Sequence, residues 1–243
     1  MAQTVRILTA GDSSILVEFG KEISPEINRR IANTVQLMKE QQIEGVVDMI
    51  PAFCSLLINY DPRVISYEKM KKRIQALVRV DIKRGETSKR LFEIPVVYGG
   101  EYGPDLAFIA QNAGMSQEEV VKIHSSCDYL IYMLGFLPGF CYLGGLDERI
   151  HTPRLSTPRI KIPAGSVGIG GSQTGIYPLD SPGGWQLMGM TPVKTYDPNR
   201  EVPILVEAGD YIRFVPIDEA EYLRIKDLAD RGEYQCVVRE QEA

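Results

Sequence analysis

The sequence predicts an α+β protein of two domains, with a small α/β domain before a larger domain made chiefly of β-structure. The 243-residue chain is long enough to bury two modest cores. Residues 1–84 alternate apolar runs typical of strands with two amphipathic helical patterns. Residues 85–90 belong to a charged run with almost nothing apolar to bury, which indicates a linker. From residue 129 the pattern is strand and turn almost to the end, so we expect residues 91–243 to form a β-domain closed into a barrel.

The first domain begins with two predicted strands joined by the turn residues Gly11 and Asp12. A helix is expected from Ser24, an N-cap residue that precedes a proline at the first helical position. After two further strands, Ser66 is expected to cap a second helix. Two helices on one face of a mostly antiparallel sheet make an α+β unit. The expected strands span residues 5–9, 15–19, 46–50 and 53–60.

The second domain opens with a predicted strand over residues 92–98 and a helix over residues 105–113, which Gly114 ends. Ser116 and Glu119 have the spacing of a capping box and open another short helix. The remaining regular elements that we expect near the C-terminus are a helix at residues 219–229 and a strand at residues 234–239.

Composition and charge narrow the classes of function. The formal net charge of -5 argues against general nucleic-acid binding, although residues 1–90 carry an excess of positive charge and the remainder an excess of negative charge. Nothing at the start resembles a signal peptide, and glycines with Pro138 interrupt the longest apolar stretch, so we expect a cytoplasmic protein without a membrane span. Widely spaced cysteines and only two histidines do not predict a metal site; the cysteines are Cys54, Cys127, Cys141 and Cys236.

Residues 162–193 hold eight glycines, four prolines and a single charge, Asp180. Such a run cannot be a helix, because glycine supplies positive φ and proline withdraws a backbone donor. Large apolar residues interleave the turns, which is not typical of a disordered linker. The segment therefore predicts ordered backbone that lines a pocket or an interface.

Two patterns beside this segment favour a ligand pocket. Phe136, Phe140 and Tyr142 stand at alternate positions, and the bend expected at Pro138 turns their rings toward a groove, although such a row is most often core. The guanidinium forks of Arg154 and Arg159 suit a carboxylate or a phosphate, although both arginines are equally typical of an ordinary surface. Neutral polar side chains would orient a ligand or satisfy turn backbone. The residues expected to form the substrate or interface pocket are Phe136, Pro138, Phe140, Tyr142, Arg154, Arg159, Ser166, Gly170, Gly171, Gln173, Thr174, Tyr177, Ser181 and Trp185.

Several catalytic signatures are missing. The sequence has no Walker-type phosphate loop, and Gln173 stands where a dinucleotide fingerprint beginning at Gly168 needs its third glycine. No serine sits in a complete G-x-S-x-G, and a serine-hydrolase triad would need His124 or His151 as its base. No residue is assigned as general acid, base or nucleophile.

The motifs of the second domain resemble those of a known family. The sequence resembles the 5-oxoprolinase B-subunit family in four places. These are the opening Gly-Asp-Ser at 11–13, GFLPGFCYLGGL at 135–146, the TPR triplets at 152–154 and 157–159, and the long glycine-rich motif at 163–192. This family is also called the sporulation kinase inhibitor KipI, or allophanate hydrolase subunit 1. The resemblance implies a small α/β domain joined to a cyclophilin-like β-barrel. One departure is Met190, where relatives often carry a basic residue, which leaves Arg154 and Arg159 as candidate cations for an anionic ligand.

The resemblance also implies a function. Family members act with 5-oxoprolinase subunits A and C to convert 5-oxo-L-proline to L-glutamate at the expense of ATP. Because this chain has no nucleotide motif, ATP is expected to bind a partner or a composite site, and the chain is expected to be inactive alone. The alternative implied by the KipI name is a binding protein that inhibits autophosphorylation of a sporulation sensor histidine kinase, with Lys71, Lys72 and Arg73 docking on an acidic helix. Peptidyl-prolyl isomerase activity would follow only from barrel analogy.

Overall fold

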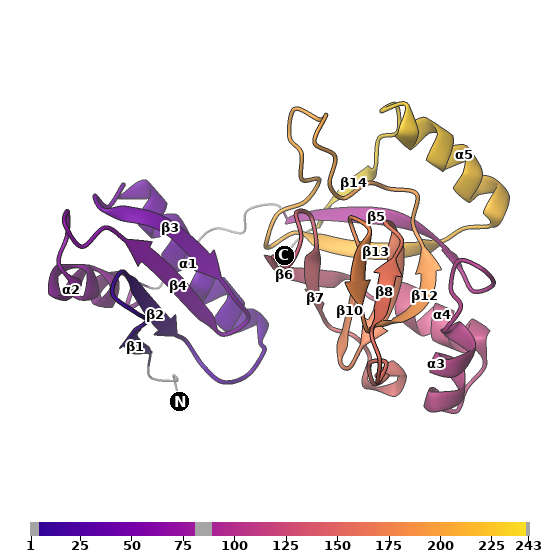
Figure 1. Ribbon diagram of the computed structural model, residues 1–243, viewed down its shortest axis with the longest axis horizontal. Helices are drawn as coiled ribbons and strands as arrows, with labels where there is room; N and C mark the ends of the chain where they lie inside the picture. Colours follow the sequence, from indigo (N-terminus) through magenta and orange to yellow (C-terminus); the bar gives the residue numbers. More distant parts are fainter. Residues whose placement is uncertain (1–4, 81–88, 242–243) are drawn as a thin grey trace. The chain divides into compact units, whose positions relative to one another are not determined.

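The computed structural model describes residues 5–80 and 89–241, and the chain divides into two compact units, Met1–Thr87 and Ser88–Ala243 (Figure 1). Most of the expected linker at 85–90 lies outside the described residues. Its last two residues, Lys89 and Arg90, differ from the expectation because they begin the long strand β5.

The first unit contains a four-stranded antiparallel sheet, as the sequence predicts, and its strand order is β1-β2-β4-β3. Alternate residues of β2 and β4, such as Ile15 and Leu56, are buried in one core with Ile31 and Ile74 of the two helices. The elements of this unit are β1 (Arg6–Thr9), β2 (Ser14–Glu18), α1 (Pro25–Glu40), β3 (Val46–Pro51), β4 (Ser55–Tyr60) and α2 (Tyr67–Leu77).

Local signals at the helix and strand ends are mostly confirmed. The Ser24 hydroxyl accepts a hydrogen bond from the Ile27 amide at 3.2 Å and caps α1. Ser66 occupies the N-cap position of α2, but its side chain makes no capping hydrogen bond, so burial of the apolar face stabilises this helix without that contact. Strand β4 begins at Ser55 rather than Phe53, because the Ala52 amide donates to the Ser55 carbonyl and closes a hairpin turn over residues 52–55.

The second unit is built around a nearly closed barrel of seven strands in the order β10-β9-β12-β5-β13-β6-β7, with β10 next to β7 (Figure 1). Strands β5 and β13 are parallel, and the other paired neighbours are antiparallel. The barrel strands are β5 (Lys89–Tyr98), β6 (Tyr129–Leu134), β7 (Cys141–Gly144), β9 (Ser166–Gly170), β10 (Gln173–Ile176), β12 (Gln186–Met190) and β13 (Tyr211–Pro216).

The remaining elements of the second unit cover or extend the barrel. Gly114 ends α3 in the left-handed conformation at φ 67°, and Ser116 with Glu119 forms the predicted capping box of α4. The last strand begins at Val237 rather than Tyr234, because Tyr234 and Cys236 instead pack against the barrel core. These elements are α3 (Leu106–Ala113), α4 (Gln117–Ser125), the 3₁₀ turn η1 (Glu148–Ile150), β8 (Arg159–Ile162), β11 (Ser181–Gly183), α5 (Glu219–Asp230) and β14 (Val237–Gln241), which pairs with β5.

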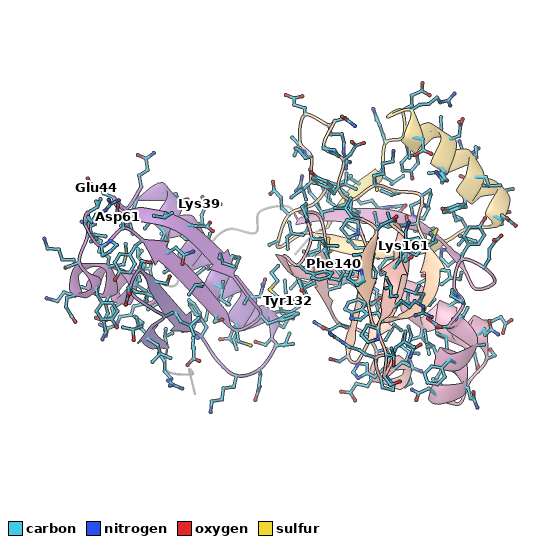
Figure 2. The ribbon with its side chains drawn as sticks, in the orientation of Figure 1. Lys39, Glu44, Asp61, Tyr132, Phe140 and Lys161 are labelled. Atoms are coloured by element: carbon cyan, nitrogen blue, oxygen red, sulfur yellow. The ribbon has the colours of Figure 1, made fainter. Side chains whose placement is uncertain are left out.

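Strands on one side of the barrel contribute to two separate apolar clusters. Ile169 of β9 and Met188 of β12 belong to the barrel core, whereas Leu187, next to Met188, belongs to a smaller cluster with Phe140 and Trp185. Successive strand residues point to opposite faces, so this smaller cluster lies on the outer face of the barrel wall. Strands β8 and β11 pair beside it, and Lys161 of β8, labelled in Figure 2, forms a 2.7 Å ion pair with Asp180.

Candidate functional site

The outer cluster borders a pocket of about 300 Å³ on the barrel unit. Its wall combines aromatic rings, one arginine, prolines and a pair of glycines. None of the described residues that line it is a carboxylate, histidine, serine or cysteine. The lining residues are Phe136, Phe140, Tyr142, Arg154, Pro158, Tyr177, Pro182, Gly183, Gly184 and Trp185.

Phe140 is the centre of the aromatic wall. Its ring lies edge-on to four neighbours, with centroid separations of 5.5 Å to Phe136, 5.1 Å to Tyr142, 5.5 Å to Tyr177 and 5.6 Å to Trp185. Edge-to-face pairs contribute about 0.5–1.5 kcal/mol each beyond the area they bury. Because Phe140 and Trp185 are also buried, the wall is held in place before any ligand arrives.

Phe136 has an unusual conformation at the edge of this pocket. Its φ of 66° lies in the left-handed region, and its side chain is exposed, with 62% of its surface accessible. A bulky residue in that region costs roughly 1–3 kcal/mol, and such strain is concentrated at functional sites. The strained residue follows Gly135 and precedes the exposed Pro138 in the turn between β6 and β7. An exposed ring held at this cost favours a role in binding.

The glycine-rich strands make room for Trp185. A Cβ atom on Gly170 would overlap the indole ring, so only glycine allows β9 to approach it this closely. A Cβ atom on Gly183 would lie 2.6 Å from the Tyr177 hydroxyl. Gly170 therefore lies behind the pocket wall rather than on it, and Gly171 pairs its backbone with Thr152.

Asp105 joins three elements around Trp185. The Asp105 carboxylate accepts hydrogen bonds from the Arg159 guanidinium at 2.7 Å and from the Leu187 amide at 2.6 Å. Arg159 also donates to the Trp185 carbonyl at 3.2 Å. The pair is partly buried, with side-chain exposures of 29% for Arg159 and 14% for Asp105. Arg159, expected as a cation for a ligand, instead holds the backbone at Trp185, just before β12, and Asp105 neutralises its charge.

Arg154 is the cation at the pocket. Its guanidinium lies over the Trp185 ring, 5.8 Å from the centroid, and its one long hydrogen bond runs 3.4 Å to the Gln173 side-chain carbonyl. No carboxylate in the described parts of the chain lies within ion-pair distance of Arg154. Burial raises the pKa of the Tyr177 hydroxyl, and the positive charge of Arg154 is the largest effect that opposes this shift. Tyr177 therefore stays neutral, and Arg154 gives the pocket a positive charge.

The other expected polar residues do not line the pocket. Thr174 is buried in the barrel interior, where its hydroxyl donates to the Gly168 carbonyl at 3.1 Å. Ser166 and Ser181 are also buried, and their hydroxyls make no hydrogen bond to the described residues. Met190 is not a lining residue, and its side chain lies beside Gly165. The expected residues outside the lining are Pro138, Arg159, Ser166, Gly170, Gly171, Gln173, Thr174 and Ser181.

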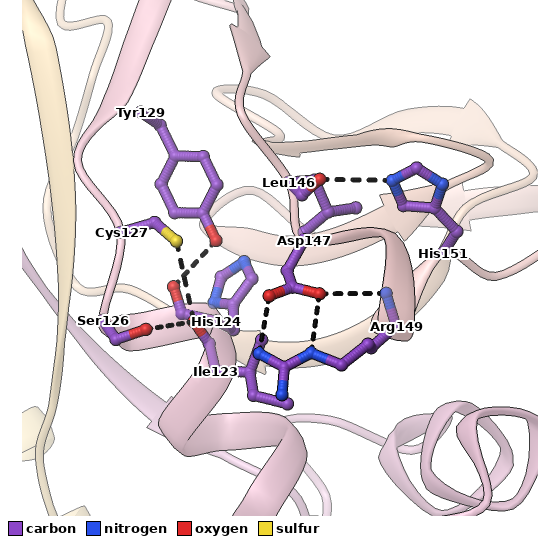
Figure 3. Close-up of polar contacts among 9 residues, drawn as sticks. All are labelled: Ile123, His124, Ser126, Cys127, Tyr129, Leu146, Asp147, Arg149 and His151. Carbon is purple, nitrogen blue, oxygen red and sulfur yellow. Dashed lines mark hydrogen bonds and ion pairs between the residues drawn. The ribbon is translucent and has the colours of Figure 1, made fainter.

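Both histidine rings have structural partners. His124 is buried, and burial lowers its pKa to about 3, so the ring is neutral. The Thr174 hydroxyl donates its proton to the Gly168 carbonyl, so it accepts from His124 Nε2 at 2.8 Å. In the neutral ring Nδ1 is then the acceptor, and it accepts from the Tyr98 hydroxyl at 2.8 Å. His151 Nε2 donates to the Leu146 carbonyl at 3.2 Å (Figure 3). Neither ring is hydrogen-bonded to a serine or a cysteine among the described residues.

The lining residues that were not predicted are Pro158, Pro182, Gly183 and Gly184. A signal was present for the glycines, because they directly precede Trp185 inside the segment already singled out. On α2, Lys72 and Arg73 are exposed, and Lys71 Nζ lies 5.4 Å from the Tyr67 ring centroid. The kinase-docking hypothesis for these residues stays a prediction.

The described residues lack two further features. Within residues 5–80 and 89–241, no group of three or more histidine, cysteine, aspartate or glutamate side chains gathers as metal ligands. No helix in this part of the chain has the length and apolar character needed to cross a membrane.

Comparison with known proteins identifies relatives. The family model described as carboxyltransferase domain, subdomain C and D, matches residues 5–206. Over 237 residues the chain is 43% identical to the B subunit of 5-oxoprolinase from Bacillus subtilis (strain 168), and the match covers 93% of this chain and 99% of that protein. A conserved uncharacterized protein from Pyrococcus horikoshii, of solved structure, is 49% identical, with a TM-score of 0.53 over 89% of this chain and 100% of that one. The urea carboxylase of Kluyveromyces lactis is 25% identical, with a TM-score of 0.82 over 98% of this chain but only 24% of that one.

Proposed function

Because this chain belongs to the 5-oxoprolinase B-subunit family, within the carboxyltransferase-domain family, we propose that it is a subunit of an ATP-dependent 5-oxoprolinase. In this reaction water is added across the lactam C–N bond of 5-oxo-L-proline, which gives L-glutamate. Two partner subunits, A and C, complete the enzyme. The observation that carries the proposal is the 43% identity to the Bacillus subtilis protein across nearly the full length of both chains.

The pocket supports the view that the chain does not act alone. An amide is a poor electrophile, so lactam opening needs an activating reaction and groups that move protons. Among the described residues, the pocket lining supplies aromatic rings, two of them phenols, and one guanidinium, but no carboxylate, histidine, serine or cysteine. We therefore infer that a partner, or a site shared with a partner, supplies the reacting groups and binds ATP, while this chain contributes binding surface.

Reconstitution tests this function. Purified chain is mixed with candidate partner subunits A and C, 5-oxo-L-proline and ATP, and glutamate release is followed while one component at a time is omitted. We expect release only from the complete mixture. Activity that persists without this chain would refute the subunit role, and glutamate release by this chain alone would refute its dependence on partners.

A further inference from the structure

The pocket on the outer barrel wall has features that select a class of ligand. Its volume of about 300 Å³ is at the lower end of the range of small-molecule sites. Phe140, Tyr142, Tyr177 and Trp185 supply flat apolar surfaces, which suit a small planar ring better than a flexible polar chain. Because the rings already pack edge-to-face on Phe140, binding does not need to order them, and this preorganisation favours affinity.

Charge narrows the class further. Arg154 brings positive charge to the pocket without a carboxylate partner among the described residues, whereas Arg159 is neutralised by Asp105. One guanidinium fork matches one carboxylate through two parallel hydrogen bonds. A phosphate ester or a nucleotide carries more negative charge and commonly uses several cations or a helix N-terminus, and the lining contains neither. The neutral Tyr177 phenol adds no negative charge to repel a carboxylate.

We propose that this chain by itself binds a small planar ring acid in this pocket, with the ligand carboxylate on Arg154 and the ring against the aromatic wall. This proposal rests on the proposed function for its specific ligand, 5-oxo-L-proline, whose flat lactam ring carries one carboxylate. The chain then acts as the subunit that holds the substrate by its acid group. The partner subunit approaches the exposed lactam. Phe136, which is strained and exposed at the pocket edge, then contacts the partner.

The test uses Trp185, because it is the single tryptophan of the chain and its ring lies on the pocket wall. The full chain is titrated with 5-oxo-L-proline and with 2-pyrrolidinone, which has the same ring without the carboxylate, while intrinsic fluorescence and calorimetric heat are followed. We expect a saturable response to 5-oxo-L-proline and at least about tenfold weaker binding of 2-pyrrolidinone, since a charge-assisted bidentate contact is lost.

Variants locate the contact. Arg154→Met keeps much of the side-chain volume but removes the charge, and we expect it to weaken 5-oxo-L-proline binding at least about tenfold while leaving 2-pyrrolidinone binding unchanged. Arg154→Lys keeps the positive charge but loses the guanidinium fork, so its affinity for 5-oxo-L-proline should lie between those of the wild type and Arg154→Met. The matched control is Arg149→Met, because Arg149 is an exposed arginine paired with Asp147 outside the pocket. Circular dichroism of each variant checks that it is folded.

Three results would overturn the proposal: no saturable binding by the isolated chain, equal affinity for the two probes, or no difference between Arg154→Met and Arg149→Met. These results are distinct from failure of the proposed function. A complete mixture that needs this chain for activity, although the chain alone binds no 5-oxo-L-proline, overturns only the pocket proposal. Binding by the chain together with activity that survives its omission overturns only the subunit role.

Discussion

Replacing Asp105 with alanine should loosen the wall of the pocket and destabilise the barrel unit. The substitution removes hydrogen bonds to Arg159 at 2.7 Å and to the Leu187 amide at 2.6 Å, and it leaves both partners without their acceptor. Hydrogen bonds to a charged group contribute about 1.5–3 kcal/mol each, and breaking a fully buried ion pair costs about 3–5 kcal/mol. Arg159 is 29% exposed and can regain some hydration, so we expect a loss of about 2–4 kcal/mol.

The loss can be measured by urea unfolding followed through Trp185 fluorescence, which reports on the barrel unit because it is the single tryptophan. For a unit of this size, 1 kcal/mol corresponds to a shift in Tm of about 2–4 °C, so a decrease of roughly 5–15 °C is expected. Without Asp105, Arg159 is no longer positioned to donate to the Trp185 carbonyl, so Trp185 is held less firmly. The native tryptophan emission should therefore also move to longer wavelength.

Asp147→Ala is the matched control. Like Asp105, Asp147 accepts from a guanidinium and from a backbone amide, but its partner Arg149 is 65% exposed (Figure 3). Exposed ion pairs contribute little, so this variant should change Tm and tryptophan emission far less than Asp105→Ala. Equal shifts in the two variants would refute the argument that Asp105 braces the pocket.

Gly170→Ala should displace the Trp185 ring and lower the free energy of unfolding by about 1–3 kcal/mol, with a red shift of emission in native buffer; an unchanged spectrum would contradict the close approach. Because burial holds the pKa of His124 near 3, well below its unfolded value of 6.5, the stability it contributes is complete above pH 6.5 and is lost as the pH falls toward 3. His124→Gln should therefore flatten the fall in unfolding free energy between pH 6.5 and 4 by up to about 1.4 kcal/mol per pH unit, and parallel curves would refute this. Phe136→Gly relieves left-handed strain, so the free energy of unfolding should stay within about 1 kcal/mol of the wild type, whereas 5-oxo-L-proline binding should weaken; a large loss of stability would show that the ring serves folding.

The sequence predicted most where the signal is local. Ser24 caps α1, and Ser116 with Glu119 forms a capping box, because each contact joins residues three apart. The spacing of Phe136, Phe140 and Tyr142 also predicted that their rings lie together, and the three rings do form one aromatic cluster. This signal is local too, because only the turn at Pro138 and Gly139 separates Phe136 from Phe140.

Contacts distant in sequence could not be predicted in this way. Asp105 and Arg159 are 54 positions apart, and nothing in either local pattern indicates their pairing. Thr174 was expected at the ligand, but the pleat of β10 places it on the face of Ile176, inside the barrel. Ser166 lies on the face of β9 opposite Val167 and is buried there without lining the pocket. A pleat inverts the exposure of every residue when the register moves by one, so a strand assignment without register cannot tell pocket from core.

The two arginines show how tertiary partners narrow the chemistry of a pocket. Arg154 and Arg159 are the third residues of two Thr-Pro-Arg triplets, so the sequence alone makes them equal candidates for an anion. The structure distinguishes them, because Asp105 neutralises Arg159, whereas Arg154 contacts the Trp185 ring and Gln173 but no carboxylate among the described residues. One uncompensated guanidinium can neutralise one carboxylate, whereas ATP would bring several negative charges to a pocket with a single cation. If the complex consumes ATP, we therefore expect the nucleotide to bind elsewhere, which is consistent with the proposal that this pocket holds the acid.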